Sequence, residues 1–175
     1  MDLNALTKPL DVEDIDFRIQ SITKSGYAII LAYKNARVDM NRLDMAVGSL
    51  YWKREHLNGN ANCIVSIWNN EIGQWVSKED TGKESFTEKE KGLASDSFKR
   101  ACFNWGIGRE LYDFPFIIVQ LLPEEFTSDA KGCKATNKLK LKDWRWKLER
   151  SEDNKLTYLG AIHNQKLRFQ FGKLK

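Results

Sequence analysis

The stretch Trp75–Leu111, WVSKEDTGKESFTEKEKGLASDSFKRACFNWGIGREL, decides the fold of this chain. It begins as the end of a strand, turns at Thr81-Gly82 and continues as one long helix. Thr87 and Glu90 form a T-x-x-E capping box, which predicts that the helix begins at Thr87. Apolar side chains at helical spacing form its core stripe, namely Ala94, Phe98, Ala101, Cys102 and Trp105. We therefore expect this helix to pack against the sheet that contains the preceding strand.

The other face of the predicted helix is polar and carries the adjacent cations Lys99 and Arg100. Two fixed positive charges on a helix that packs against a sheet can hold the backbone of a polyanion. The alternative is a solvated ion-pair cluster, in which Asp96 pairs with Lys99 at i+3 and with Arg100 at i+4. Such pairs contribute only ~0.3–0.5 kcal/mol each. The local sequence leaves both interpretations open, and Asp96 could also orient a cation for binding.

The residues before this segment predict an antiparallel meander with helices beside it. Asn58-Gly59 separates two strand-like runs, and it is a strong hairpin signal because both residues must accept a positive φ. Residues 36–47 have one apolar face and stop at Gly48, which predicts a helix. The expected strands are 17–22, 27–33 (buried), 52–57, 61–68 and 74–78. The fold class is therefore α+β, an antiparallel β-meander packed on a long helix, with extra C-terminal β-strands.

The last third of the chain is predicted to form these extra strands. An apolar run that ends near residue 122 is followed by a polar stretch, 123–138, which we expect to be a linker. The sequence thus divides into a core (1–122), the linker (123–138) and a C-terminal basic β-strand extension (139–175) that packs on or beside the core.

One of the C-terminal strands, LKLKDWRWKLER at 139–150, could present a row of cations. A bulge near Lys142-Asp143 would place its leucines and tryptophans on one face. Lys140, Arg145 and Lys147 would then line the opposite face at about 6.6–7 Å spacing, close to that of successive phosphates. The alternative is an ordinary amphipathic sheet whose polar face is exposed to solvent.

Charge is distributed unevenly along the chain. Residues 131–175 hold 13 Lys/Arg and 4 Asp/Glu, whereas the remaining residues hold 15 and 20. This asymmetry indicates either a cationic binding surface or a lysine-rich face that serves solubility.

Motifs for catalysis and cofactors are missing from the sequence. It has no G-x-x-x-x-G-K-[ST] loop for a nucleoside triphosphate. Its three cysteines have no metal-ligand spacing, so we expect neither a cofactor nor a metal. No apolar run reaches 18 residues and the N-terminal stretch has no signal core, which predicts a cytoplasmic protein without a membrane partner.

Together these elements resemble the Sak-type single-strand annealing proteins of bacteriophages, which share a superfamily with the eukaryotic repair protein Rad-fifty-two. The resemblance runs from about Ile15 to Leu111. It rests on RVDMNRLDMAVG followed by Trp52, on the hairpin CIVSIWNNEIGQWVSKEDTG, and above all on KGLASDSFKRACFNWGIGREL. It implies a β-β-β-α annealing and DNA-binding core, closed homo-oligomeric rings, a groove for single-stranded DNA with exposed bases, and annealing without ATP. It also implies a phage or prophage gene expressed in a bacterial host, with a host single-strand-binding protein as a possible partner.

The resemblance assigns roles to individual positions of this sequence. Lys99 and Arg100 would contact the DNA backbone in the inner groove, and Asp96 would support them. Arg18, on the first strand, is a candidate for a further basic residue that the family uses there.

Lys83 and Lys91 lie near the position of the family's second, outer DNA site. The chain departs from the eukaryotic pattern in a shorter segment after the Gly82 turn and in Phe103, where a further Arg is common. The strands predicted after residue 139 have no counterpart in the part of the family that this sequence resembles.

The leading hypothesis is a protein that coats single strands and pairs complementary ones for recombination and repair, without bond-breaking catalysis. The alternative is a metal-dependent nucleic-acid enzyme, a nuclease that uses Glu79 and Asp80. A third hypothesis is an assembly module that forms rings by strand pairing and binds protein instead of DNA.

Overall fold

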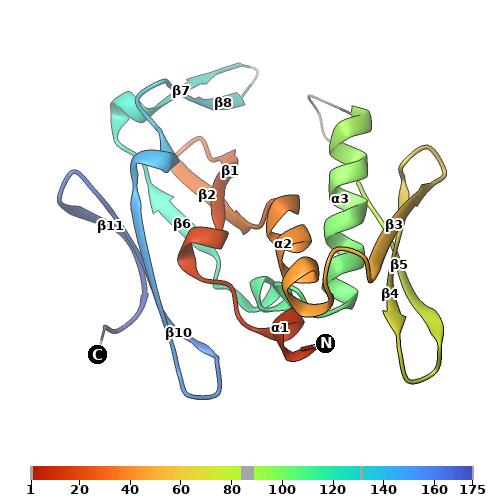
Figure 1. The fold of residues 1–175 in the computed structure, drawn as a ribbon. Helices are drawn as coiled ribbons and strands as arrows, with labels where there is room; N and C mark the ends of the chain where they lie inside the picture. Colours follow the sequence, from red (N-terminus) through yellow and green to blue (C-terminus); the bar gives the residue numbers. More distant parts are fainter. Residues whose placement is uncertain (1, 84–88, 131, 175) are drawn as a thin grey trace. The chain divides into compact units, whose positions relative to one another are not determined.

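The computed structural model describes residues 2–83, 89–130 and 132–174 (Figure 1). The chain forms two compact units. The first contains Met1–Leu10 and Lys34–Tyr112, and the second contains Asp11–Tyr33 and Asp113–Lys175. The core, linker and extension predicted from the sequence are each one continuous range of residues. Each of these two units instead combines two separate segments of the chain.

The first unit is an antiparallel meander with helix α3 packed on one face (Figure 1). The strand order is β3-β4-β5, so the central strand β4 pairs with both neighbours. The elements of this unit are α1 (Asn4–Thr7), α2 (Ala36–Val47), β3 (Trp52–Leu57), β4 (Asn62–Asn69), β5 (Gln74–Thr81), α3 (Lys89–Asn104) and the 3-10 helix η2 (Arg109–Asp113), whose last residue belongs to the second unit. The meander and helix predicted from the sequence are thus confirmed.

Local sequence signals set the boundaries of several of these elements. The side chain of Asn35 accepts a hydrogen bond from the backbone N–H of Arg37 at 2.8 Å and so caps α2 at its N-terminus. Gly48 ends the helix with φ 85°. Asn58 and Gly59 both have positive φ, as the hairpin between β3 and β4 requires.

The core of the first unit lies between α3 and the sheet. Phe98, Ala101 and Cys102 of the predicted stripe are fully buried, and they pack with the inward residues of β4. The start of α3 at Thr87 cannot be compared with the prediction, because Thr87 lies outside the described residues. In the described part the helix runs from Lys89.

Gly82 brings the chain after β5 into direct contact with α3. A methyl group at this position would lie 2.6 Å from the backbone nitrogen of Ser97 and 2.8 Å from the carbonyl oxygen of Leu93. The N–H of Gly82 donates to the carbonyl of Ala61 at 2.7 Å. Only glycine permits this approach of backbone to backbone.

The second unit contains two three-stranded antiparallel sheets and a hairpin. The sheets have the orders β1-β2-β6 and β11-β10-β9, and their apolar side chains share one core. The strands are β1 (Asp16–Ile22), β2 (Tyr27–Tyr33), β6 (Ile117–Gln120), β7 (Phe126–Asp129), β8 (Gly132–Ala135), β9 (Arg145–Arg150), β10 (Leu156–His163) and β11 (Lys166–Gly172). Three 3-10 helices complete it: η1 (Val12–Asp14), η3 (Pro123–Glu125) and η4 (Leu141–Asp143).

Three expectations for this unit differ from the structure. The strand at 27–33 is buried on one face only, because its alternate residues Tyr27 and Leu31 are exposed. The stretch 123–138, expected to be a linker, contains η3 and the β7-β8 hairpin. The bulge expected near Lys142-Asp143 is instead the 3-10 turn η4. The apolar side chains before and after this turn pack into the same core. Within the described residues, no helix is both long and apolar enough to cross a bilayer.

Candidate nucleic-acid interface

Asp96 is the centre of a hydrogen-bonded group on the polar face of α3. Its Oδ2 accepts from Nε of Arg100 at 2.9 Å and from the backbone N–H of Lys83 at 2.9 Å. The carboxylate therefore fixes the Arg100 side chain and ties the chain after β5 to the helix. Burial alone would raise the pKa of Asp96, but these two hydrogen bonds and the charges of Arg100 and Lys99 outweigh it and hold the pKa below its ordinary value.

Arg100 is oriented by this contact and still reaches the solvent. Its side chain is 33% exposed. The hydrogen bond from Arg100 to Asp96 is the main cause that raises the pKa of the guanidinium, so the group stays charged. A positioned guanidinium offers its remaining N–H groups to an anion with little loss of side-chain freedom.

Lys99 is partly buried, and a buried ion pair makes a long hydrogen bond to its backbone carbonyl. Nζ of Lys34 donates to the carbonyl of Lys99 at 3.4 Å and pairs with Asp39. The Lys34 ammonium also lies 4.3 Å from the centre of the Phe103 ring. Burial raises the pKa of Asp39 to about 6, and the charge of Lys34 opposes that rise.

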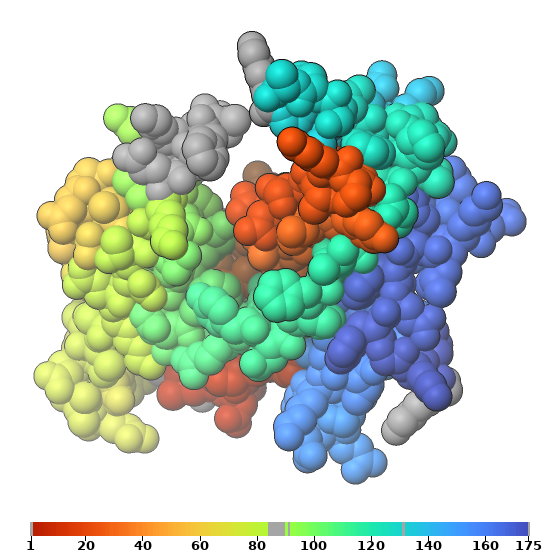
Figure 2. Space-filling model, turned by 180° about the vertical axis from the view of Figure 1, so that it is seen from behind, coloured from red at the N-terminus to blue at the C-terminus, as the bar shows by residue number. Residues whose placement is uncertain are grey.

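The structure brings some of the predicted residues together and separates others. Lys83, Asp96, Lys99 and Arg100 belong to the first unit and lie at the junction of β5 and α3. Figure 2 shows β5 and the C-terminal part of α3 on one continuous surface. Lys91 belongs to α3, but its side chain lies outside the described residues.

The other predicted cations belong to the second unit. Arg18 is exposed on β1, where its guanidinium lies 5.3 Å from the centre of the Tyr33 ring. Arg145 and Lys147 are exposed on β9, and Lys147 forms an ion pair with Glu149 at 2.9 Å. The expected row of three is wrong for Lys140, because η4 separates this residue from the strand.

Glu79 and Asp80 point to opposite faces of β5, as neighbours on a strand do. Glu79 accepts from the side chain of Asn62 at 2.6 Å, whereas Asp80 accepts from the side chain of Asn104 at 3.2 Å. Among the described residues, no group of three or more His, Cys, Asp or Glu side chains could hold a metal ion. The two carboxylates are thus engaged separately in the fold.

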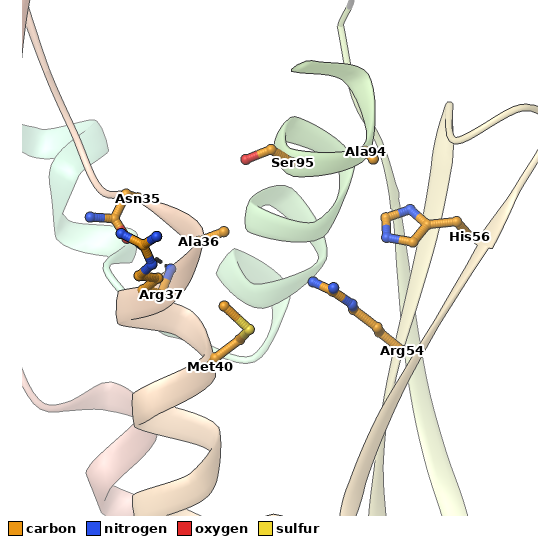
Figure 3. Close-up of a pocket in the computed structure, with 8 residues that line it drawn as sticks. All are labelled: Asn35, Ala36, Arg37, Met40, Arg54, His56, Ala94 and Ser95. Carbon is orange, nitrogen blue, oxygen red and sulfur yellow. Dashed lines mark hydrogen bonds between the residues drawn. The ribbon is translucent and has the colours of Figure 1, made fainter. Parts of the chain in front are cut away.

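The sequence interpretation missed a pocket in the first unit, which lies between α2, β3 and α3 (Figure 3). Arg37, Arg54 and His56 line it. A signal was present in the sequence, because Arg54 and His56 alternate with Trp52 and so share its inward face. Polar residues at inward positions of a strand indicate a cavity or a functional site.

No protein-family model matches this chain, and no curated protein or solved structure matches it either. The resemblance to the annealing proteins therefore stays a hypothesis that rests on the residues themselves.

Proposed function

We propose that this chain is an ATP-independent single-stranded DNA-binding and annealing protein of the Sak type. The observation that carries the proposal is the arrangement at α3, where Asp96 fixes the guanidinium of Arg100 beside Lys99. A helix held rigidly on a sheet presents these charges at fixed positions, which suits contact with a phosphate backbone.

In this proposal the protein binds the strand through its phosphates and leaves the bases free. Lys99 and Arg100 attract the backbone, and counterion release supplies most of the binding free energy. A complementary strand can then pair with the exposed bases, and this step needs no covalent chemistry. The meander β3-β4-β5 with α3 would correspond to the β-β-β-α core of the annealing proteins, and several copies would form a ring with single-stranded DNA as partner.

A double variant, Lys99→Ala with Arg100→Ala, tests the site. We expect weaker binding to an oligothymidylate and a salt dependence that is shallower by about 1.4 in log–log slope, because two phosphate contacts are lost. The matched control is Lys155→Ala with Lys166→Ala, which removes the same charge from exposed positions of the second unit. If both double variants bind alike, the site assignment is wrong.

A second experiment tests the activity and separates it from a nuclease. Complementary labelled strands are mixed with the protein, once with EDTA and once with magnesium or manganese, always without ATP. We expect faster annealing of intact strands under both conditions. Cleavage that requires the metal would instead support the nuclease that uses Glu79 and Asp80, and binding to neither strand would support an assembly module.

A further inference from the structure

A pocket in the first unit collects cationic side chains from two elements (Figure 3). Its volume is about 440 Å³. Arg54 and His56 project into it from β3, and Arg37 belongs to the first turn of α2. The remaining lining residues are Asn35, Ala36, Met40, Ala94 and Ser95.

The register of the sheet places Arg54 and His56 on the side of β3 that faces α3, where Arg54 is exposed and His56 is half-buried. Arg54 pairs with Val65 and His56 pairs with Cys63, and both partners are fully buried residues of β4 that face α3. At such positions a strand normally carries apolar side chains. The Arg54 guanidinium lies 4.8 Å from the centre of the buried Phe98 ring, which supports its extended position over the core.

The described residues that line this pocket do not balance its positive charge. None of the described residues that line it is acidic, and neither Arg37 nor Arg54 forms an ion pair with a described residue. Burial lowers the pKa of His56 and the positive charge of Arg54 lowers it further, so the imidazole already responds to this excess charge. An anion would relieve the repulsion.

We infer that this pocket binds a phosphate group. The Arg54 guanidinium supplies forked N–H donors of the kind that match phosphate oxygens, and Arg37 adds positive charge from the α2 side of the pocket (Figure 3). The Ser95 hydroxyl points toward α2 in Figure 3 and adds a neutral donor. The volume exceeds that of one phosphate, and Met40 and Ala36 offer an apolar wall for an attached sugar.

The pocket continues the proposed track of the nucleic-acid backbone along α3. Ser95 and Lys99 are four residues apart, so they occupy one face of the helix about one turn from each other. A strand held at Lys99 could therefore place a neighbouring phosphate in the pocket. This link to single strands rests on the proposed function, whereas phosphate binding itself does not.

The test uses inorganic phosphate as the probe and the His56 ring as the reporter. The chain has two histidines, and His163 lies in the second unit, so its signal is the internal reference. We expect a saturable NMR shift of the His56 signal with phosphate at constant ionic strength, and none with chloride. Arg54→Gln should weaken phosphate binding by about tenfold, whereas Lys53→Gln should not, because Lys53 is on the other face of β3 and lies over Trp75.

Each outcome decides between the alternatives. A shift that never saturates, or one that is equal in Arg54→Gln and wild type, overturns the inference. If Arg54→Gln does not fold, Arg37→Gln replaces it, because Arg37 lines the same pocket from α2.

The source of the phosphate is tested with an oligothymidylate that lacks terminal phosphates. If it shifts His56 and loses affinity in Arg54→Gln, the backbone is the ligand. If only inorganic phosphate does so, the pocket takes a free or terminal phosphate. In that case the inference that the pocket binds phosphate is supported even if Lys99→Ala with Arg100→Ala leaves the binding of single strands unchanged.

Discussion

The buried ion pair between Lys34 and Asp39 gives the sharpest prediction for stability. Their side chains are 1% and 0% exposed, so neither charge is solvated by bulk water. Asp39→Asn would leave the Lys34 ammonium buried without its counter-charge, and Lys34→Met would leave the carboxylate in the same position. Removing one partner of a buried pair costs about 3–5 kcal/mol. We expect each single variant to lower the free energy of unfolding by that amount.

The double variant separates the pair from the packing around it. Lys34→Met with Asp39→Leu replaces both charges by apolar groups, and such exchanges are often neutral or stabilising. Lys34 also contacts the carbonyl of Lys99 at 3.4 Å, a long and weak hydrogen bond whose loss adds little. We therefore expect the double variant to recover at least half of the stability lost in either single variant.

Urea unfolding followed by circular dichroism measures these differences, with Lys53→Met as a control for loss of an exposed cation. A cost below about 1 kcal/mol in both single variants would show that the pair is effectively solvated. A double variant that loses the sum of the single costs would show that the two charges do not compensate each other. Either result would refute this account of the pair.

Three further predictions concern single positions. Gly82→Ala should lower the unfolding midpoint in urea more than Gly73→Ala does, because a methyl group at Gly82 meets the backbone of α3 at 2.6 Å. At Gly73 a methyl group meets nothing within 4 Å and adds only the strain of a φ of 63°; equal midpoints would contradict this. Burial raises the pKa of Glu125, but its hydrogen bonds, chiefly from Arg168, outweigh this and lower the pKa. As the pH falls below the ordinary glutamate pKa of 4.5, the unfolded chain therefore binds more protons than the folded chain, and the free energy of unfolding decreases. Glu125→Gln should make the free energy of unfolding depend less on pH, as measured by urea titrations at about pH 3–7. Asp96→Asn should weaken oligothymidylate binding roughly two- to fivefold, because the partly exposed pair that orients Arg100 is lost; tighter binding would show that Asp96 only neutralises the cation.

The elements that the sequence predicted best carry their signals within a few neighbouring residues. The helix end at Gly48 and the turn at Asn58-Gly59 depend on local φ values, and both are present. The pair between Asp96 and Arg100 also follows from helical spacing alone. Such features need no knowledge of the rest of the fold.

The features that the sequence did not predict depend on contacts between distant segments. The bond from the Lys83 N–H to Asp96 exists only because the Gly82 turn lies on α3. The η4 turn replaces a bulge because the apolar residues on both sides of it pack into one core. The proposed phosphate pocket combines α2, β3 and α3, and no periodicity within one of them indicates the others.

The interleaving of the two units has a consequence for biosynthesis. β1 and β2 leave the ribosome early, but β6, which pairs with the other edge of β2, is translated only after the whole of the first unit. Until then that edge of β2, next to the apolar Ala28 and Ile30, has no partner of its own sheet. An open edge of this kind can pair with another chain. Nascent chains that stall before β6 should therefore be the most prone to aggregate.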